Sequence, residues 1–149
     1  MPRYTRSSLF PDVNVWIALT YERHAHHLAA RNWFQTLERD ARLFFCRLTQ
    51  IGFLRLLTNE AVMGPDGVMG QAEAWKVYDR WKEDDRVLFV DEPRGLEPTF
   101  RSISQLRRPA PKDWADSYLA AFAMVSGMTL ITFDQGFQAR ISDLIVLEK

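Results

Sequence analysis

The stretch Ser8-Leu9-Phe10-Pro11-Asp12-Val13-Asn14-Val15 decides the fold class of this chain. Its apolar start predicts a short buried strand over 8–10, and its polar end predicts a turn into a helix through Trp16, Ile17 and Leu19. Further short apolar runs predict strands at 43–46, 87–90, 130–132 and 144–147. Short buried strands that alternate with helices are typical of a parallel sheet covered on both faces. We therefore expect an α/β protein.

Helical spacing of apolar residues fills the intervals between these strands. It predicts helices over 26–40, 49–57, 71–84, 96–106 and 113–126, and a short helix that begins at Asp134. Thr49 is expected to cap the second of these helices, and Gly127 to end the fifth. The Pro- and Gly-rich clusters at 64–67, 93–95 and 109–111 are too short to be domain linkers. We expect one domain over 1–149.

The composition excludes several classes of protein. The chain has 149 residues, of which 47% are hydrophobic and 26% charged, so it is not a disordered or coiled-coil sequence. Its single cysteine, Cys46, excludes an internal disulfide framework and a cysteine-built zinc site, and it fits a reducing cytoplasm. No run of 18 apolar residues is present, and the basic N-terminus does not continue into a signal peptide. We expect a cytoplasmic protein with no membrane segment.

The net charge is zero, with 19 Lys plus Arg against 19 Asp plus Glu. This balance argues against a protein that coats nucleic acid non-specifically. It is compatible with a local site that binds nucleic acid. Fifteen of the 19 basic residues are arginine, whose planar fork holds phosphate well, although a GC-rich genome would give the same bias. Arg107 and Arg108 lie in an acid-free run that leads into the helix at 113–126. They are equally well interpreted as an RNA-holding rim or as an ordinary exposed loop.

Four aspartates lie near the carboxyl ends of the predicted strands or in the helix before one of them. Parallel sheets usually hold their functional residues at the carboxyl ends of the strands. Asp12 follows the first strand, Asp134 follows the strand at 130–132, and Asp113 and Asp116 are spaced to share one helix face. Clustered carboxylates repel each other, and a bound divalent cation removes that cost. Oxygen ligands without histidine or thiol suit Mg²⁺ or Mn²⁺, whose common chemistry in such a site is phosphodiester hydrolysis.

Each aspartate also has a purely structural interpretation. Asp12 and Asp134 can cap the helices that follow them, and Asp113 alone is better explained as a cap or a first-turn partner of the helix dipole. Asp116 is harder to explain in this way, because it faces the apolar side of its helix next to Leu119. The combination of all four positions favours the metal site.

Three segments form a recognisable set: Phe10-Pro11-Asp12-Val13-Asn14-Val15, Asp116-Ser117-Tyr118-Leu119-Ala120-Ala121-Phe122-Ala123 and Leu130-Ile131-Thr132-Phe133-Asp134. Together they resemble the PIN domain, and more narrowly the VapC toxins of bacterial VapBC toxin–antitoxin modules. The likeness covers nearly the whole chain and implies a three-layer α/β/α PIN-like fold with a mostly parallel central sheet. It also implies an endoribonuclease that depends on Mg²⁺ or Mn²⁺.

The resemblance assigns expected roles to single residues. Asp12, Asp116 and Asp134 would be the catalytic, metal-binding acids, with Asn14 and Thr132 in support. Arg55 would meet RNA phosphate or the partner protein. The likeness further implies a homodimer that acts on RNA and is silenced by a cognate VapB-type antitoxin.

One departure from the family pattern concerns the helix after the second strand, where the family commonly has a glutamate. Residues 41–59 contain no Asp or Glu, and Gln50 is the nearest polar residue that can support the site. We expect Asp113 to act as a metal ligand and to supply the missing charge. The alternative is a weakened PIN-fold protein that binds RNA or an antitoxin without cutting.

Two other patterns have weaker interpretations. His24, His26 and His27 are expected in a solvated turn before the next helix, with RNA contact as the alternative. A receiver-like signalling domain also has clustered aspartates, but it needs a lysine after a late strand. No lysine follows Leu130-Ile131-Thr132, so that class is disfavoured.

Overall fold

The computed structural model describes residues 8–148 and contains a sheet of five parallel strands. The strands are β1 (Ser8–Pro11), β2 (Arg42–Phe45), β3 (Val87–Phe89), β4 (Thr129–Thr132) and β5 (Leu144–Val146). Their order across the sheet is β3-β2-β1-β4-β5, and every neighbouring pair is parallel. The expected α/β class is confirmed, and the sheet is wholly parallel over the described residues rather than mostly so. The predicted domain over 1–149 includes residues 1–7 and 149, which lie outside the described range.

The order of the strands creates a switch point in the middle of the sheet. From β1 the chain moves outward to β2 and β3, and it then returns to the other side of β1 for β4 and β5. In the central pair, Leu9 lies opposite Thr129 and Pro11 lies opposite Ile131. Chain connections diverge at this point, so the carboxyl ends of β1 and β4 are free to hold functional side chains.

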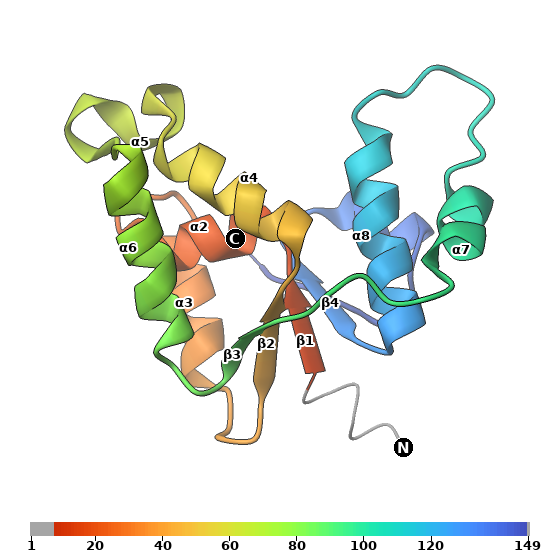
Figure 1. Cartoon of the computed structure of the whole chain (residues 1–149), viewed down its shortest axis with the longest axis horizontal. Helices are drawn as coiled ribbons and strands as arrows, with labels where there is room; N and C mark the ends of the chain where they lie inside the picture. The colour runs from red at the N-terminus through yellow and green to blue at the C-terminus, as the bar shows by residue number, and fades with distance from the viewer. Residues whose placement is uncertain (1–7, 149) are drawn as a thin grey trace.

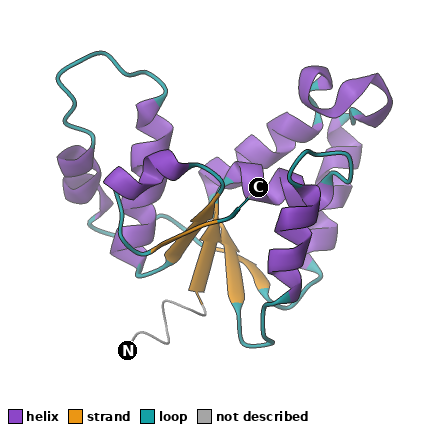
Figure 2. Ribbon diagram, turned by 180° about the vertical axis from the view of Figure 1, so that it is seen from behind, coloured by secondary structure: helices purple, strands orange, loops and turns teal. Residues whose placement is uncertain are grey.

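Helices cover both faces of the sheet, which gives the three-layer arrangement (Figures 1 and 2). One side carries α2 (Val13–Thr20), α3 (His27–Gln35), α4 (Arg47–Leu57), α5 (Glu60–Gly67) and α6 (Gln71–Lys82). The other side carries α7 (Leu96–Ile103) and α8 (Asp113–Ser126), and a 3₁₀ helix, η1 (Gln135–Ala139), follows β4. Among residues 8–148, no helix is both long enough and apolar enough to cross a membrane.

Alternation along β1 divides the core between the two faces. Leu9 belongs to the cluster with Trp16 and Phe45, whose rings stack with centroids 4.0 Å apart. Phe10 belongs to the opposite cluster and stacks on Phe122 of α8 at 4.9 Å. Both β1 side chains are almost fully buried. The central strand is therefore anchored on both sides, which fixes where it ends.

Several details of the helices differ from the sequence-based predictions. Helix α4 begins at Arg47, and Thr49 is not its cap: the Thr49 hydroxyl accepts the Cys46 backbone N–H at 2.9 Å from the third helical position. Helix α5 was not predicted, because Gly64-Pro65 has the composition of a turn. Gly64 adopts a positive φ of 77° and kinks the helix, which continues beyond it. Several predicted helices also end earlier, α3 at Gln35 and α7 at Ile103.

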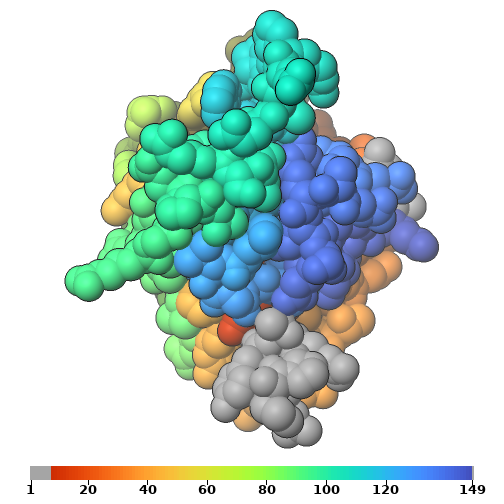
Figure 3. Space-filling view, turned by 90° about the vertical axis from the view of Figure 1, so that its right-hand side faces the viewer, coloured from red at the N-terminus to blue at the C-terminus, as the bar shows by residue number. Residues whose placement is uncertain are grey.

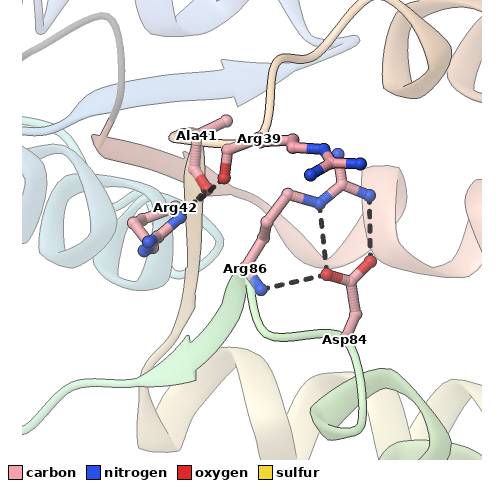
Figure 4. Close-up of polar contacts among 5 residues, drawn as sticks. All are labelled: Arg39, Ala41, Arg42, Asp84 and Arg86. Atoms are coloured by element: carbon pink, nitrogen blue, oxygen red, sulfur yellow. Dashed lines mark hydrogen bonds and ion pairs between the residues drawn. The ribbon is translucent and has the colours of Figure 1, made fainter.

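A cluster of polar contacts stabilises the amino ends of β2 and β3 (Figure 4). Arg86 donates from Nε and Nη2 to the two carboxylate oxygens of Asp84, at 3.1 and 2.9 Å, and its backbone N–H also binds Asp84. The Arg86 guanidinium lies over the Phe34 ring at 4.7 Å. This hydrogen bonding holds the pKa of Asp84 below its usual range. Arg86 thereby joins β3 to α3 at the end of the sheet opposite to Asp12.

We predict that Arg86→Gln lowers the free energy of unfolding by about 1–2 kcal/mol, because it removes a two-pronged charged contact that is only partly exposed. Urea denaturation followed by circular dichroism measures this change. Arg101→Gln is the matched control, since its pair with Glu97 is largely exposed and should contribute at most about 0.5 kcal/mol. Equal effects of the two substitutions would contradict the prediction.

Candidate active site

Asp12 lies at the carboxyl end of β1 and has two structural functions there. Its backbone N–H donates to Ile131 O at 2.9 Å, which continues the pairing with β4. Its Oδ1 accepts the Val15 N–H at 3.1 Å, so the side chain caps α2. The capping interpretation of Asp12 is therefore correct. It leaves the second carboxylate oxygen for another contact.

Thr132, at the end of β4, connects two of the aspartates. Its hydroxyl donates to Asp12 Oδ2 at 2.5 Å and accepts the Asp134 backbone N–H at 3.0 Å. The Asp134 side chain caps η1 by accepting the Gly136 N–H at 2.8 Å. The expected hydrogen bond of Thr132 within the acidic cluster is thus present. It places Asp12 and Asp134 on either side of one threonine.

The Asp12 carboxylate pays a desolvation cost in this position. Only 6% of the residue is exposed, and this burial raises the pKa of Asp12 to about 6. Hydrogen bonds from Thr132 and from the backbone of Val15 and Asn14 oppose the rise, while the negative charge of Asp116 adds to it. A positive charge placed next to this carboxylate would stabilise its ionised form and lower its pKa.

Asp116 lies in the first turn of α8, where its charge acts on Asp12. Its pKa is raised chiefly by burial, and the charges of Asp134 and Asp113 raise it further. The positive charge of Arg140 acts in the opposite direction. Asp116 therefore interacts electrostatically with each of the other three predicted aspartates, Asp12, Asp134 and Asp113.

Asp113 differs from the other three because its charge is already balanced. It forms an ion pair with Arg140, and its Oδ2 accepts a hydrogen bond from the Ser117 hydroxyl at 2.7 Å. The hydrogen bond from Arg140 is the main reason that the pKa of Asp113 lies below its usual range. Arg140 also donates to Gly136 O at 2.8 Å, so it ties η1 to α8. Sequence reasoning missed Arg140, since nothing local links it to a residue 27 positions away.

The side chain of Gln50 contacts Arg47 and Tyr78 rather than the aspartates. It is buried on α4, where its Oε1 accepts a hydrogen bond from Arg47 at 2.5 Å and its side chain also bonds Tyr78. The Arg47 guanidinium in turn lies over the Phe89 ring at 4.6 Å. The position expected to carry a glutamate therefore holds an amide whose oxygen is already used.

The three predicted arginine contacts lie outside the acidic cluster. Arg55 is exposed on α4 and lines a pocket of about 230 Å³ with Ile51 and Trp75, between α4 and α6. Arg107 and Arg108 are exposed on the segment 104–112, which projects beyond α7 and leads into α8 (Figures 1 and 3). This segment ends beside Asp113, whose pKa is lowered in part by the charge of Arg108.

Two of the three histidines lie in the turn before α3, as expected, and they also border one of the aspartates. His24 and His26 are half-buried and line a pocket of about 550 Å³ together with Asn14 and Asp134. Burial is the main reason that the pKa of His24 falls below its usual value. His27 lies elsewhere, with its Nδ1 at 2.7 Å from Ala18 O. The expected turn is therefore confirmed, and both side chains are partly rather than fully exposed in it.

The donor chemistry of the cluster fits a hydrated divalent cation. Asp12, Asp116 and Asp134 offer only hard oxygen atoms, and two of them have raised pKa values that a cation would lower. Across residues 8–148, no three carboxylate, imidazole or thiol groups are close enough to surround an ion directly. Mg²⁺ commonly keeps several of its waters and binds through one or two carboxylates.

Comparison with known proteins identifies the family. The family model described as "PIN domain" matches residues 9–142. The chain belongs to the PIN-domain family. Within that family it is similar to the ribonuclease VapC41 of Mycobacterium tuberculosis, with 43% identity over 132 residues that cover 87% of this chain and 90% of the relative. This likeness places the chain among the VapC ribonucleases, as the three sequence motifs implied.

Solved structures show the same fold at low sequence identity. The VapC20 toxin of Mycobacterium tuberculosis, described as cleaving the sarcin-ricin loop, aligns with a TM-score of 0.65 and 15% identity over 95% of this chain and all of that one. VapBC2 of Rickettsia felis, solved with a DNA fragment from its promoter, aligns with a TM-score of 0.65 and 11% identity, covering 94% of this chain and 98% of that one. These alignments confirm the PIN-like architecture.

We predict that Asp12→Asn stabilises the metal-free PIN domain at neutral pH. Because the pKa of Asp12 is about 6 in the folded state and 3.8 without burial, stability from this group is fully present below about pH 4 and is lost as the pH rises through 6. The variant should unfold with a free energy about 2–3 kcal/mol higher than wild type near pH 7 and nearly equal near pH 4. Urea denaturation in EDTA at the two pH values measures the difference. The exposed Asp40→Asn should show no such pH-dependent gain.

We also predict that Arg140→Gln raises the pKa of both Asp113 and Asp116, because both carboxylates are stabilised by its positive charge. Carboxyl-carbon NMR titration of the two aspartates measures the change. Arg101→Gln, which removes an arginine from α7 instead, should leave both pKa values where they are. An unchanged Asp116 pKa in Arg140→Gln would show that the guanidinium does not reach the cluster.

Proposed function

We propose that this VapC ribonuclease hydrolyses RNA phosphodiester bonds internally, that it needs Mg²⁺ or Mn²⁺, and that a cognate VapB-type antitoxin neutralises it. The observation that carries the proposal is that Asp116 interacts electrostatically with both Asp12 and Asp134 near the switch point of the sheet, and that the pKa values of Asp12 and Asp116 are raised. Carboxylates that are costly to keep charged next to each other are typical of sites whose cation is part of the working protein.

Each side chain would have a distinct task in this reaction. Asp12, Asp116 and Asp134 would supply oxygen ligands, and Thr132 would hold Asp12 and Asp134 in place through its two hydrogen bonds. When bound, Mg²⁺ or Mn²⁺ activates water and stabilises the leaving oxygen. Asp113 would serve mainly to hold Arg140, since that pair leaves it little free charge. Its predicted role as a metal ligand would require the pair to open.

Positive side chains at the rim would hold the RNA backbone. Arg107 and Arg108 are exposed on the segment 104–112, which leads into α8, so phosphates bound there would lie close to the acidic cluster. Arg55 is better placed for the antitoxin, because its neighbours Ile51 and Trp75 are exposed apolar side chains. Solved relatives that include antitoxin complexes support an antitoxin partner for this chain. A homodimer and a cytoplasmic location complete the proposal.

A second function is favoured by one observation at Gln50. The amide brings no charge, and its oxygen is engaged by Arg47. A site with one fewer acid should bind cations more weakly, and the protein would then hold RNA or an antitoxin without cutting it. Cation affinity separates the two functions, since the binding-only protein should show no measurable affinity for Mn²⁺.

We predict that the purified protein, free of antitoxin, cuts total bacterial RNA at discrete positions with Mg²⁺ or Mn²⁺. Asp116→Asn keeps the shape of the side chain but removes its charge, so cleavage should fall at least about 100-fold. Gel analysis of the RNA measures cleavage, and calorimetric titration with Mn²⁺ measures the loss of cation affinity. EDTA should abolish cutting in the wild-type reaction.

The controls separate a wrong site from a wrong function. Asp40→Asn removes a carboxylate from an exposed turn and should cut like wild type. Cutting that survives Asp116→Asn would place the chemistry elsewhere or reveal a contaminating nuclease. Intact RNA in every reaction of the folded protein, together with no affinity for Mn²⁺, would favour the binding-only function.

A further inference from the structure

We propose that the pocket lined by Asn14, His24, His26, Phe133, Asp134 and Gln135 binds a nucleobase of the RNA next to the phosphate that is cut. The proposal rests on the ribonuclease function, since it adds a base-binding subsite to that reaction. It assigns a substrate-binding role to two histidines that the catalytic cluster does not use.

The pocket is continuous with the acidic cluster. Asp134 belongs to both, and Asn14 follows Asp12 by two residues in the first turn of α2. Its volume of about 550 Å³ lies within the range of small-molecule sites. A nucleotide whose phosphate lies at the aspartates would therefore have its base within reach of this pocket.

Three rings form one side of the pocket. The His26 ring lies over Phe133 with centroids 4.8 Å apart and a tilt of 31°, and the His24 ring lies 5.5 Å from that of His26. Phe133 is largely buried beneath them, whereas both histidines are partly exposed. Bases of single-stranded RNA stack on aromatic side chains of this kind, because every base has a flat π face.

Hydrogen bonding fixes how His24 faces the pocket. The His26 backbone N–H donates to His24 Nδ1 at 3.0 Å, so this nitrogen acts as an acceptor. The proton of the neutral ring is then on Nε2, which can donate to a base. The exposed Asn14 amide, which also lines the pocket, adds a donor and an acceptor. Together these groups can read the polar edge of a base.

The charge of the pocket favours a base over a phosphate. None of the six lining residues is Lys or Arg, and one of them is Asp134. A phosphate in this place would face a carboxylate with no counter-charge, whereas an uncharged heterocycle would not. The arginine-bearing segment 104–112 offers the better place for phosphates. An RNA chain that spans both would place its backbone over the aspartates.

Binding of short RNA to the cleavage-deficient Asp116→Asn protein tests the proposal. The probes are fluorescent oligoadenylate and oligouridylate of eight nucleotides, and an eight-unit abasic ribose-phosphate chain, each with Mg²⁺. Fluorescence anisotropy should show about tenfold tighter binding of the better base-bearing probe than of the abasic chain. Adding His26→Ala should remove that preference, while His26→Phe, which keeps a ring, should retain most of it.

His27→Ala is the matched control, because His27 lies in the same segment but does not line the pocket. It should keep the base preference, and thermal melting of each variant checks that the fold is intact. NMR signals of the His24 and His26 rings should shift when the preferred probe is added and stay in place with the abasic chain.

Equal affinity of the base-bearing and abasic probes would overturn the proposal. An unchanged base preference in His26→Ala would overturn it as well. The wild-type cleavage assay separates this failure from that of the ribonuclease function. If RNA is cut with the same efficiency by wild type and His26→Ala, only the base subsite is wrong. If wild type cuts no RNA, the ribonuclease function itself fails.

Discussion

The contact between Thr132 and the buried Asp12 carboxylate is the constraint on which the rest of the site depends. It exists only when β1 and β4 pair in the observed register, with Pro11 opposite Ile131. The same carboxylate begins α2, and the same threonine holds the backbone of Asp134. A single slip of that register would separate Thr132 from the Asp12 side chain and break the link between Asp12 and Asp134, since neighbouring strand residues face opposite ways.

Most of the fold could be predicted because its signals are local. The apolar runs at 8–10 and 130–132 are short and unbroken, as strands buried on both faces must be, and the aspartates follow them directly. Helix α5 was missed because Gly64 and Pro65 interrupt its pattern, although a positive φ at Gly64 lets the helix resume. Helix α4 starts two residues early because Thr49 accepts the Cys46 N–H from inside the helix.

The candidate site could be predicted only in part, because some of its members are assembled by distant segments. Local spacing placed Asp12 and Asp134 at the carboxyl ends of strands and Asp116 in the first turn of a helix. Arg140 and His26 have no such signal, since their partners Asp113 and Phe133 are 27 and 107 residues away in the sequence. The expectation that Asp113 would replace a missing charge took no account of Arg140, which already balances it.

The position of β4 beside β1 sets the time at which a newly made chain can complete the candidate site. The two residues of the Thr132–Asp12 hydrogen bond are 120 positions apart, so the ribosome must add nearly the whole chain before the bond can form. At typical rates of synthesis this interval lasts about 6–24 seconds. For most of it, the nascent chain has Asp12 but neither Asp116 nor Asp134. A newly made chain therefore cannot complete the candidate site until its synthesis is almost finished.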